Sequence, residues 1–351
     1  MNEISAICRI FGQDPVNINR SPVTNENGIT NRIASAQAGI FRYDVMFSDK
    51  SVRFIGKRKS ANIIANGIII LSKYDPLLFL LLLSNHKILG YNGSSVRESV
   101  FYNNIDPALE QYVPNIIGSA VGRFSGECFV AMEELPSKEL SVSDLYRAID
   151  TIVEFHGRYY GDDISAKNLG LNCYSPKDYK KTRRCLKRMF ADLSSDNLTF
   201  FGAEKTAVIN VFIDNIHTEF GAVANRRTLT HNDYCNRNIY ADDKRICIYD
   251  WELACYQNPE HDIIELLISL MTDMSDSDVT AALTYYKDKL SRLTGIAFSE
   301  NEYAMALRFN TLEFCVNKLS ILRLAGHRLK LSYIDKQVQN ASRMMDILNI
   351  S

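Results

Sequence analysis

Apolar and polar residues alternate along several short segments in the first third of the chain. Residues 41–47, FRYDVMF, have the two-residue period of a half-buried strand, and SVRFIGK at 51–57 follows as its partner after the turn SDKS. The pattern therefore predicts mainly strands up to about residue 60. CFVAMEELP, residues 128–136, predicts a further strand that leads into a loop.

Helical spacing of apolar residues dominates the rest. Residues 61–93 are mostly apolar and helix-like, and VRESVFYNNI predicts a helix with Ser94 or Ser95 as its N-cap. After Ser141 the chain reads as mainly helical. The exception is residues 239–250, IYADDKRICIYD, which predict two short strands around the turn ADDK.

This pattern predicts an α+β protein with two lobes. Residues 1–132 would form a small N-terminal lobe built on an antiparallel sheet, with a helical insertion at about 60–93. A connector at 133–140 would lead to a larger, mainly helical C-terminal lobe at 141–351.

Composition narrows the class of protein. The 351 residues have a net charge of −1 and are 46% apolar and 23% charged, as in ordinary globular proteins, so the balance gives no support for a nucleic-acid partner. The apolar run Pro76–Leu83 is far shorter than the roughly 20 residues of a membrane span, and we expect a buried helix there. Eight scattered cysteines without a CxxC pair, and an opening segment unlike a secretory signal, predict reduced thiols in the cytoplasm.

Candidate chemistry is concentrated in residues 229–252, LTHNDYCNRNIYADDKRICIYDWE. Asp233, Asn238 and Asp250 lie here among apolar residues. An amide and a carboxylate at a loop and a strand end could hold Mg²⁺, which prefers oxygen ligands, and a third carboxylate could deprotonate a hydroxyl. The alternative is that these residues cap turns, as Asp and Asn often do.

HNDYCNRN followed by IYDWE resembles the catalytic segment of the aminoglycoside phosphotransferase and choline kinase family, which has a protein-kinase-like fold. The resemblance implies that Asp233 is the catalytic carboxylate and that Asn238 and Asp250 hold Mg²⁺ against the nucleotide phosphates. It also implies that His231 braces the loop, and that Asp262 in NPEHDIIELL caps its helix and ties down the loop.

The chain departs from the family at Asn232, where the family often has glycine. Asn tolerates unusual backbone dihedrals better than most residues.

In the N-terminal lobe, Lys57 in SVRFIGK resembles the family's phosphate-contacting lysine, with Lys59 on the same side of the strand as the alternative. Glu98 in VRESVFY resembles its helix partner; the alternative is a solvated surface glutamate.

FVAMEEL resembles the family's connector between lobes. Met132 would lie near the adenine pocket, and Glu133 to Leu135 would offer backbone groups to the base; the alternative is an edge strand. In ENGITNRIAS, Thr30 and Asn31 would meet phosphate oxygens.

The resemblance implies a kinase that transfers the γ-phosphoryl group of ATP or GTP to a hydroxyl of a small acceptor, such as an aminoglycoside, another antibiotic or a choline-like amino alcohol. The alternative is a nucleotide-binding regulator, a pseudokinase without transfer activity. The sequence lacks DFG and APE, which disfavours a protein kinase. Glu252, Glu313 and Tyr303 are candidates to face the acceptor, although solvated helix faces are the commoner explanation for such residues. The basic run at 177–188 is expected to be an exposed helix face.

Overall fold

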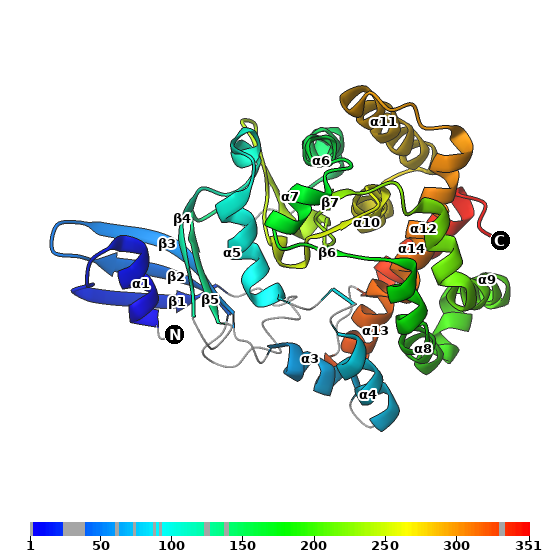
Figure 1. Ribbon diagram of the computed structural model, residues 1–351, viewed down its shortest axis with the longest axis horizontal. Helices are drawn as coiled ribbons and strands as arrows, with labels where there is room; N and C mark the ends of the chain where they lie inside the picture. Colours follow the sequence, from blue (N-terminus) through cyan, green and yellow to red (C-terminus); the bar gives the residue numbers. More distant parts are fainter. Residues whose placement is uncertain are drawn as a thin grey trace.

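The computed structural model shows a sheet-containing N-terminal lobe and a larger, mainly helical C-terminal lobe, which confirms the predicted α+β class (Figure 1). The two lobes lie side by side along the long axis of the molecule, with the N-terminal sheet at one end. The structure describes residues 3–23, 39–59, 63–72, 75–86, 89–90, 93–122, 127–136, 140–329 and 334–351.

The N-terminal sheet has five antiparallel strands in the order β1-β2-β3-β5-β4. Its strands are β1 (Asn17–Pro22), β2 (Gly39–Met46), β3 (Ser51–Lys59), β4 (Ile116–Val121) and β5 (Cys128–Met132). The predicted hairpin is confirmed as β2 and β3, and the strand at 128–136 is confirmed as β5. β4 was not predicted, because Gly118 and Ser119 interrupt its apolar pattern and a bulge shifts its register at Gly118.

The two faces of this sheet have different roles. Tyr43, Phe54 and Phe129 pack on one face under helix α1 (Glu3–Phe11), where the Tyr43 and Phe54 rings stack at 5.1 Å. Because side chains alternate along a strand, Lys57 and Lys59 of β3 point to the opposite face. The expectation that the chain is strand-like from its start was wrong over α1, whose amphipathic pattern lasts only nine residues.

Helix α5 (Ser94–Asn104) covers the face that carries the two lysines. The predicted helix is confirmed, but its N-cap is Gly93 rather than Ser94 or Ser95. Gly93 has φ = +71°, a left-handed conformation that glycine adopts without a steric cost, and the chain can therefore turn sharply into the helix.

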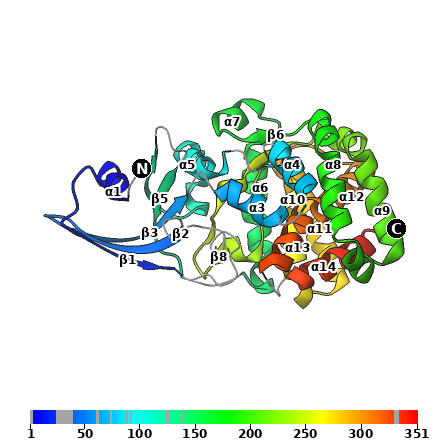
Figure 2. The same cartoon turned by 90° about the horizontal axis from the view of Figure 1, so that it is seen from below.

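The predicted helical insertion forms two helices, α3 (Ile63–Ser72) and α4 (Pro76–Asn85). Both pack on the C-terminal lobe, α3 against α13 and α4 against α8 (Figure 2). Asp75 caps α4 by accepting a hydrogen bond from the Leu78 N–H at 3.0 Å. The expected buried helix is only half buried: its Leu78 side turns inward, and the opposite side exposes Leu77, Leu80 and Leu83.

The C-terminal lobe is mainly helical, as predicted. Its helices are α6 (Leu145–Arg158), α7 (Asp163–Asn168), α8 (Pro176–Asp192), α9 (Ser194–Val223), α10 (Glu260–Leu270), α11 (Asp276–Thr294), α12 (Glu300–Val316), α13 (Lys318–Leu329) and α14 (Ile334–Ile347). Serine capping boxes begin α8, α11 and α12. The basic side chains of α8 are mostly exposed, as expected. Of the helices that the structure describes, none combines the length and apolar character needed to cross a bilayer.

Short strands carry the polar segment 229–252. The predicted hairpin is confirmed as β8 (Ile239–Ala241) and β9 (Ile246–Ile248). A second small sheet, in the order β6-β10-β7, was not predicted because its strands have only two or three residues. Its strands are β6 (Asn172–Cys173), β7 (Thr228–Thr230) and β10 (Cys255–Gln257).

A buried aromatic contact links the lobes next to this segment. Trp251 is fully buried and stacks on Phe101 of α5, with ring centroids 4.1 Å apart. Its indole N–H donates a hydrogen bond to the Ile248 carbonyl at 3.0 Å. The stacking holds the chain immediately after Asp250 against the helix that carries Glu98.

Candidate active site

His231 fixes the start of the loop between β7 and β8. Its Nε2 donates a hydrogen bond to the Tyr249 carbonyl at 2.9 Å, and its ring meets Trp251 edge-on at 4.7 Å. The imidazole is fully buried, away from any place where a substrate could meet it. These contacts fit the expected bracing role.

Asp262 of α10 ties down the same loop. Its carboxylate accepts hydrogen bonds from the backbone N–H groups of His231 at 2.7 Å and Asn232 at 2.9 Å. His156 Nε2 lies 3.1 Å from the same carboxylate. Burial opposes the charge on Asp262, but His156 and the nearby His261, whose Nδ1 lies 3.8 Å from the carboxylate, outweigh it and hold its pKa below the usual range. The expectation that Asp262 also caps its own helix was wrong, because α10 has Pro259 at its N-cap position and no side-chain cap.

Asn232 stands in the left-handed region of backbone conformations, with φ = +60°. This explains why the family often has glycine at the position, and Asn is among the residues that tolerate it. Its side chain is held on both sides: Nδ2 donates to the Leu253 carbonyl and Oδ1 accepts from Gln257 Nε2, each at 3.1 Å. The loop backbone is thus fixed immediately before Asp233.

Asp233 and Asn238 hold each other across the loop. Asn238 Nδ2 donates to the backbone carbonyl of Asp233 at 2.9 Å and to its Oδ2 at 2.7 Å. Because the amide nitrogen of Asn238 makes these hydrogen bonds, its Oδ1 remains as an oxygen that could bind a metal ion. The Tyr249 N–H donates to the Asn238 carbonyl at 3.1 Å, which places Asn238 beside the residue that precedes Asp250.

Lys57 joins the two lobes at Asp250. Its ammonium lies 2.5 Å from Asp250 Oδ1 and 3.0 Å from Glu98 Oε2, although 193 residues separate Lys57 from Asp250. Burial disfavours the charge on Lys57, but the two carboxylates outweigh it and raise its pKa. Burial likewise opposes ionisation of Asp250, and the charge of Lys57 prevails and lowers the pKa of that carboxyl.

Lys59 also reaches Glu98, at 3.1 Å, and forms a close ion pair with Glu252. Burial lowers its pKa to about 8, and the neighbouring charge of Lys57 contributes to the shift. The structure therefore brings both candidate lysines to one glutamate, but only Lys57 contacts Asp250 in the described ion pairs. We call Lys57, Lys59, Glu98, Asp250 and Glu252 the β3 cluster.

The donor set suits a hard divalent cation. Asp250 supplies a carboxylate whose two oxygens can bind Lys57 and a cation together, and Asn238 supplies an amide oxygen. Asp250 has φ = +68°, a rare conformation for a non-glycine residue, which aims the chain out of the β8–β9 hairpin. Carboxylate oxygens of Glu98, Asp250 and Glu252 also lie within 4.8 Å of one another.

The strand β5 ends at the predicted connector. Met132 is buried on the sheet face shared with Lys57, between Ile55 and Ile116 of the flanking strands. The Glu133 N–H donates to the Asn115 carbonyl at 2.9 Å, and the Glu133 carboxylate accepts from the Asn115 N–H at 2.8 Å. Leu135 is half-buried two residues farther on. Thr30 and Asn31, the predicted phosphate contacts, lie outside the described residues.

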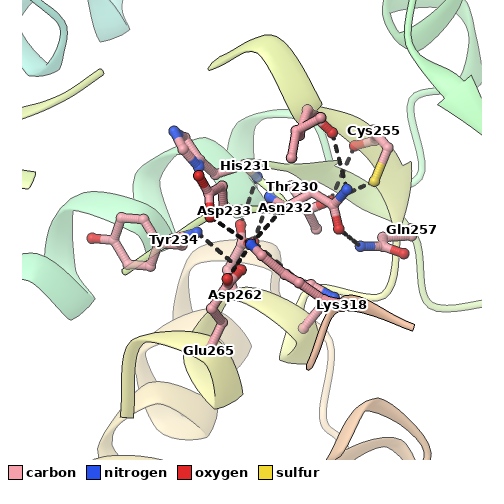
Figure 3. A network of polar contacts seen from close by, with 12 residues as sticks. Thr230, His231, Asn232, Asp233, Tyr234, Cys255, Gln257, Asp262, Glu265 and Lys318 are labelled. Carbon is pink, nitrogen blue, oxygen red and sulfur yellow. Dashed lines mark hydrogen bonds and ion pairs between the residues drawn. The ribbon is translucent and has the colours of Figure 1, made fainter. Parts of the chain in front are cut away.

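Sequence reasoning missed a second charged cluster at the loop between β7 and β8, the candidate catalytic loop, which Figure 3 shows from close by. Lys318, the first residue of α13, lies 2.6 Å from Asp233 Oδ1 and forms a close ion pair with Glu265 of α10. It also donates to the Asn232 carbonyl at 3.1 Å. Burial opposes ionisation of Asp233, but the charge of Lys318 outweighs it and lowers the pKa. We call Lys318, Asp233 and Glu265 the α13 cluster.

The three acceptor candidates are each engaged elsewhere. Glu252 is paired with Lys59 in the β3 cluster. Glu313 is buried, where its carboxylate lies 3.6 Å from His261 Nε2 and accepts a hydrogen bond from Asn317 at 2.8 Å. Tyr303 is buried among the helices and donates to the Leu283 carbonyl at 2.8 Å. The solvated-face alternative does not describe the buried Glu313 and Tyr303, and that the three residues face an acceptor stays a prediction.

A small polar-edged hollow lies beside Lys318. Tyr174, Tyr179, Thr182, Glu313 and Asn317 contribute to its lining, and Asn317 directly precedes Lys318. Leu89, at the end of the insertion, closes the hollow from the side of the N-terminal lobe.

Comparison with known proteins places this geometry in a family. The model of the phosphotransferase enzyme family matches residues 97–296, more than half of the chain. The structure is similar to a choline kinase from Streptococcus pneumoniae, with a TM-score of 0.51 and 12% identity over 98% of each chain. It is also similar to a presumed fructosamine-3-kinase from Haemophilus somnus 129PT, with a TM-score of 0.51 and 10% identity over 97% of each chain. The search of curated proteins found no match. At these identities the solved structures support the kinase-like fold alone.

Proposed function

Because the chain belongs to the phosphotransferase enzyme family, we propose that it is a small-molecule kinase that transfers the γ-phosphoryl group of ATP or GTP to a hydroxyl. The observation that carries the proposal is the contact of Lys57 with both Glu98 and Asp250, which sets a buried cation beside a candidate metal ligand. This contact requires the two lobes to lie against each other. Its position beside the catalytic loop is the one a phosphoryl-transfer site requires.

The nucleotide would lie between the lobes. Lys57 would bind the phosphates, with Glu98 holding its ammonium in place. Met132 would contact the base, and the backbone groups of Glu133 and Leu135 would bind its edge. Thr30 and Asn31 remain proposed phosphate contacts. A buried lysine paired with two carboxylates is costly to desolvate, and phosphate binding gives a reason to keep it.

Asn238 and Asp250 would hold Mg²⁺ through one amide oxygen and one carboxylate. When bound there, the ion would neutralise charge on the nucleotide phosphates. The hydrogen bonds that fix Asn238 to Asp233 would keep this ligand at a constant position relative to the reacting groups.

Asp233 would orient the acceptor hydroxyl and accept its proton. The adjacent Lys318 charge lowers its pKa and so favours the ionised form, and the carboxylate is held between Asn238 and Lys318. A carboxylate fixed in this way contributes mainly by positioning the nucleophile for in-line attack.

The acceptor would be a small hydroxylated compound such as an aminoglycoside, another antibiotic or an amino alcohol. All eight cysteines are free thiols, consistent with a reaction in the cytoplasm. A nucleotide-binding regulator is the second candidate. We favour the kinase because Asp233, Asn238 and Asp250 are all present and arranged around one loop and hairpin.

The test is a screen of hydroxylated metabolites and antibiotics for acceptor-dependent release of ADP or GDP. Asp233→Asn, which keeps the shape of the side chain, should lower the release by about 10²–10⁴-fold. Binding of a non-hydrolysable nucleotide analogue should stay within a few-fold of the unaltered protein. If release persists undiminished in Asp233→Asn, Asp233 is not the catalytic carboxylate. If no acceptor gives release while the nucleotide still binds, the regulator is the better description.

A further inference from the structure

Lys318 occupies a position that the proposed catalytic role of Asp233 does not explain. We propose that Lys318 is a positioning residue that orients Asp233 toward the acceptor hydroxyl and balances part of the charge of Glu265. This inference rests on the proposed function. It concerns a residue from a helix 85 positions beyond Asp233.

Three hydrogen-bond acceptors surround the Lys318 ammonium. It meets a carboxylate of the loop at 2.6 Å, a loop carbonyl at 3.1 Å and a carboxylate of α10 in a close ion pair (Figure 3). An ammonium has three hydrogen-bond donors, and these three acceptors use all of them. Lys318 therefore fixes Asp233 from the side opposite Asn238, which binds the other carboxylate oxygen.

Glu265 explains why a cation is needed at this position. Its side chain is only 4% exposed, and its second oxygen accepts a hydrogen bond from the Tyr234 N–H at 3.1 Å. Glu265 thus supports the loop just after Asp233. Two carboxylates this close repel each other and the nucleotide phosphates, and Lys318 removes one of the two negative charges.

The test compares the unaltered protein with Lys318→Met, Lys318→Arg and Lys318→Ala. Lys318→Met should lower phosphoryl transfer about 100-fold with the KM for nucleotide changed less than about 3-fold, and Lys318→Arg should recover at least a tenth of the activity. Ethylammonium at tens of millimolar should restore part of the activity of Lys318→Ala, whereas tetramethylammonium at equal ionic strength should not. Transfer at the unaltered rate in Lys318→Met would overturn the proposal.

Lys318→Met combined with Glu265→Gln removes a balanced pair; it should fold and still show the loss of transfer.

A readout without catalysis separates this inference from the proposed function. Ethylammonium should raise the melting temperature of Lys318→Ala more than tetramethylammonium does, and should leave the unaltered protein unchanged. If the unaltered protein transfers phosphate to no acceptor, the proposed function fails. If the melting temperature of Lys318→Ala also shows no selective response to ethylammonium, the cation site itself is disproved.

Discussion

The β3 cluster and the α13 cluster both set lysine against carboxylates at the proposed catalytic centre, but they are assembled differently. In the β3 cluster, two lysines at alternate positions of one strand meet Glu98 of the helix packed on that strand. In the α13 cluster, one lysine at the start of a helix reaches two carboxylates from separate elements. The β3 cluster has two cations and three carboxylates. Lys57 could therefore exchange its contact with Asp250 for one with a nucleotide phosphate, while Asp250 binds the metal. The α13 cluster sets one cation against two carboxylates and works as a fixed support.

The largest expected effect comes from removing the carboxylate shared by the lysine and the proposed metal. Asp250→Asn should lower phosphoryl transfer about 10³-fold, because it weakens the metal site and frees Lys57. Nucleotide affinity should also lose most of its dependence on Mg²⁺, measured by calorimetric titration with and without the ion. Asp242→Asn, in the turn of the β8–β9 hairpin, is the matched control and should keep that dependence. An unchanged magnesium response in Asp250→Asn would remove Asp250 from the metal site.

The second effect separates the two lysines of the β3 cluster. Lys57→Met should lower transfer about 10²-fold, because in the described ion pairs Lys57 is the lysine that contacts Asp250. Lys59→Met should cost less than about 10-fold, since Lys59 pairs with Glu98 and Glu252. Steady-state kinetics with varied nucleotide gives both values. The reverse order would assign the phosphate contact to Lys59.

A third, smaller effect concerns His261, which lies between the α13 cluster and Glu313. Burial disfavours its charge, but Asp262 and Glu313 outweigh it and raise its pKa to about 9 from 6.5. A raised pKa stabilises the fold below pH 6.5 and loses this contribution as the pH rises through 9, a change of about 3 kcal/mol. His261→Gln should therefore flatten the fall in unfolding free energy between about pH 7 and 10, measured by urea titration at each pH. Parallel curves for the two proteins would show that His261 is neutral in the folded state.

The smallest effect gives a baseline for both clusters. Arg188 of α8 lies 2.6 Å from Asp75, and its side chain is 42% exposed. Arg188→Ala should lower the free energy of unfolding by at most about 1 kcal/mol, measured by thermal unfolding, because solvent screens an exposed pair. Arg184→Ala, one helical turn earlier on the same exposed face, is the matched control. A loss well above that of the control would mean that this ion pair stabilises the packing of the insertion on the C-terminal lobe more than its exposure suggests.

Much of the β3 cluster could be predicted from sequence because each member lies in a local pattern. Lys57 follows a strand that alternates, Glu98 lies on a recognisable helix, and Asp250 ends an apolar strand. Local patterns also predicted the β2–β3 and β8–β9 hairpins and the helical C-terminal lobe. The choice between Lys57 and Lys59 stayed open, because both have the same orientation on β3 and only the contact with Asp250 distinguishes them.

The α13 cluster could not be predicted in the same way. Lys318 follows Asn317 at a break between two helices, and nothing in that local sequence indicates that its ammonium reaches Asp233. Glu265 lies in an apolar stretch of α10. A buried carboxylate there indicates that a cationic partner exists, but it does not identify that partner. Identifying that partner required the packing of α10, α12 and α13, which depends on contacts between distant segments.

The insertion between β3 and α5 gives the lobes a second mechanical connection. Its helices belong in sequence to the small lobe, yet they pack on α8 and α13 of the large one. Rotation about a single hinge after β5 would force α3 to slide along α13, the helix that begins with Lys318. We therefore expect nucleotide exchange to be coupled to the position of the Asp233 carboxylate, because the insertion would transmit the movement of one lobe to the helix that carries Lys318.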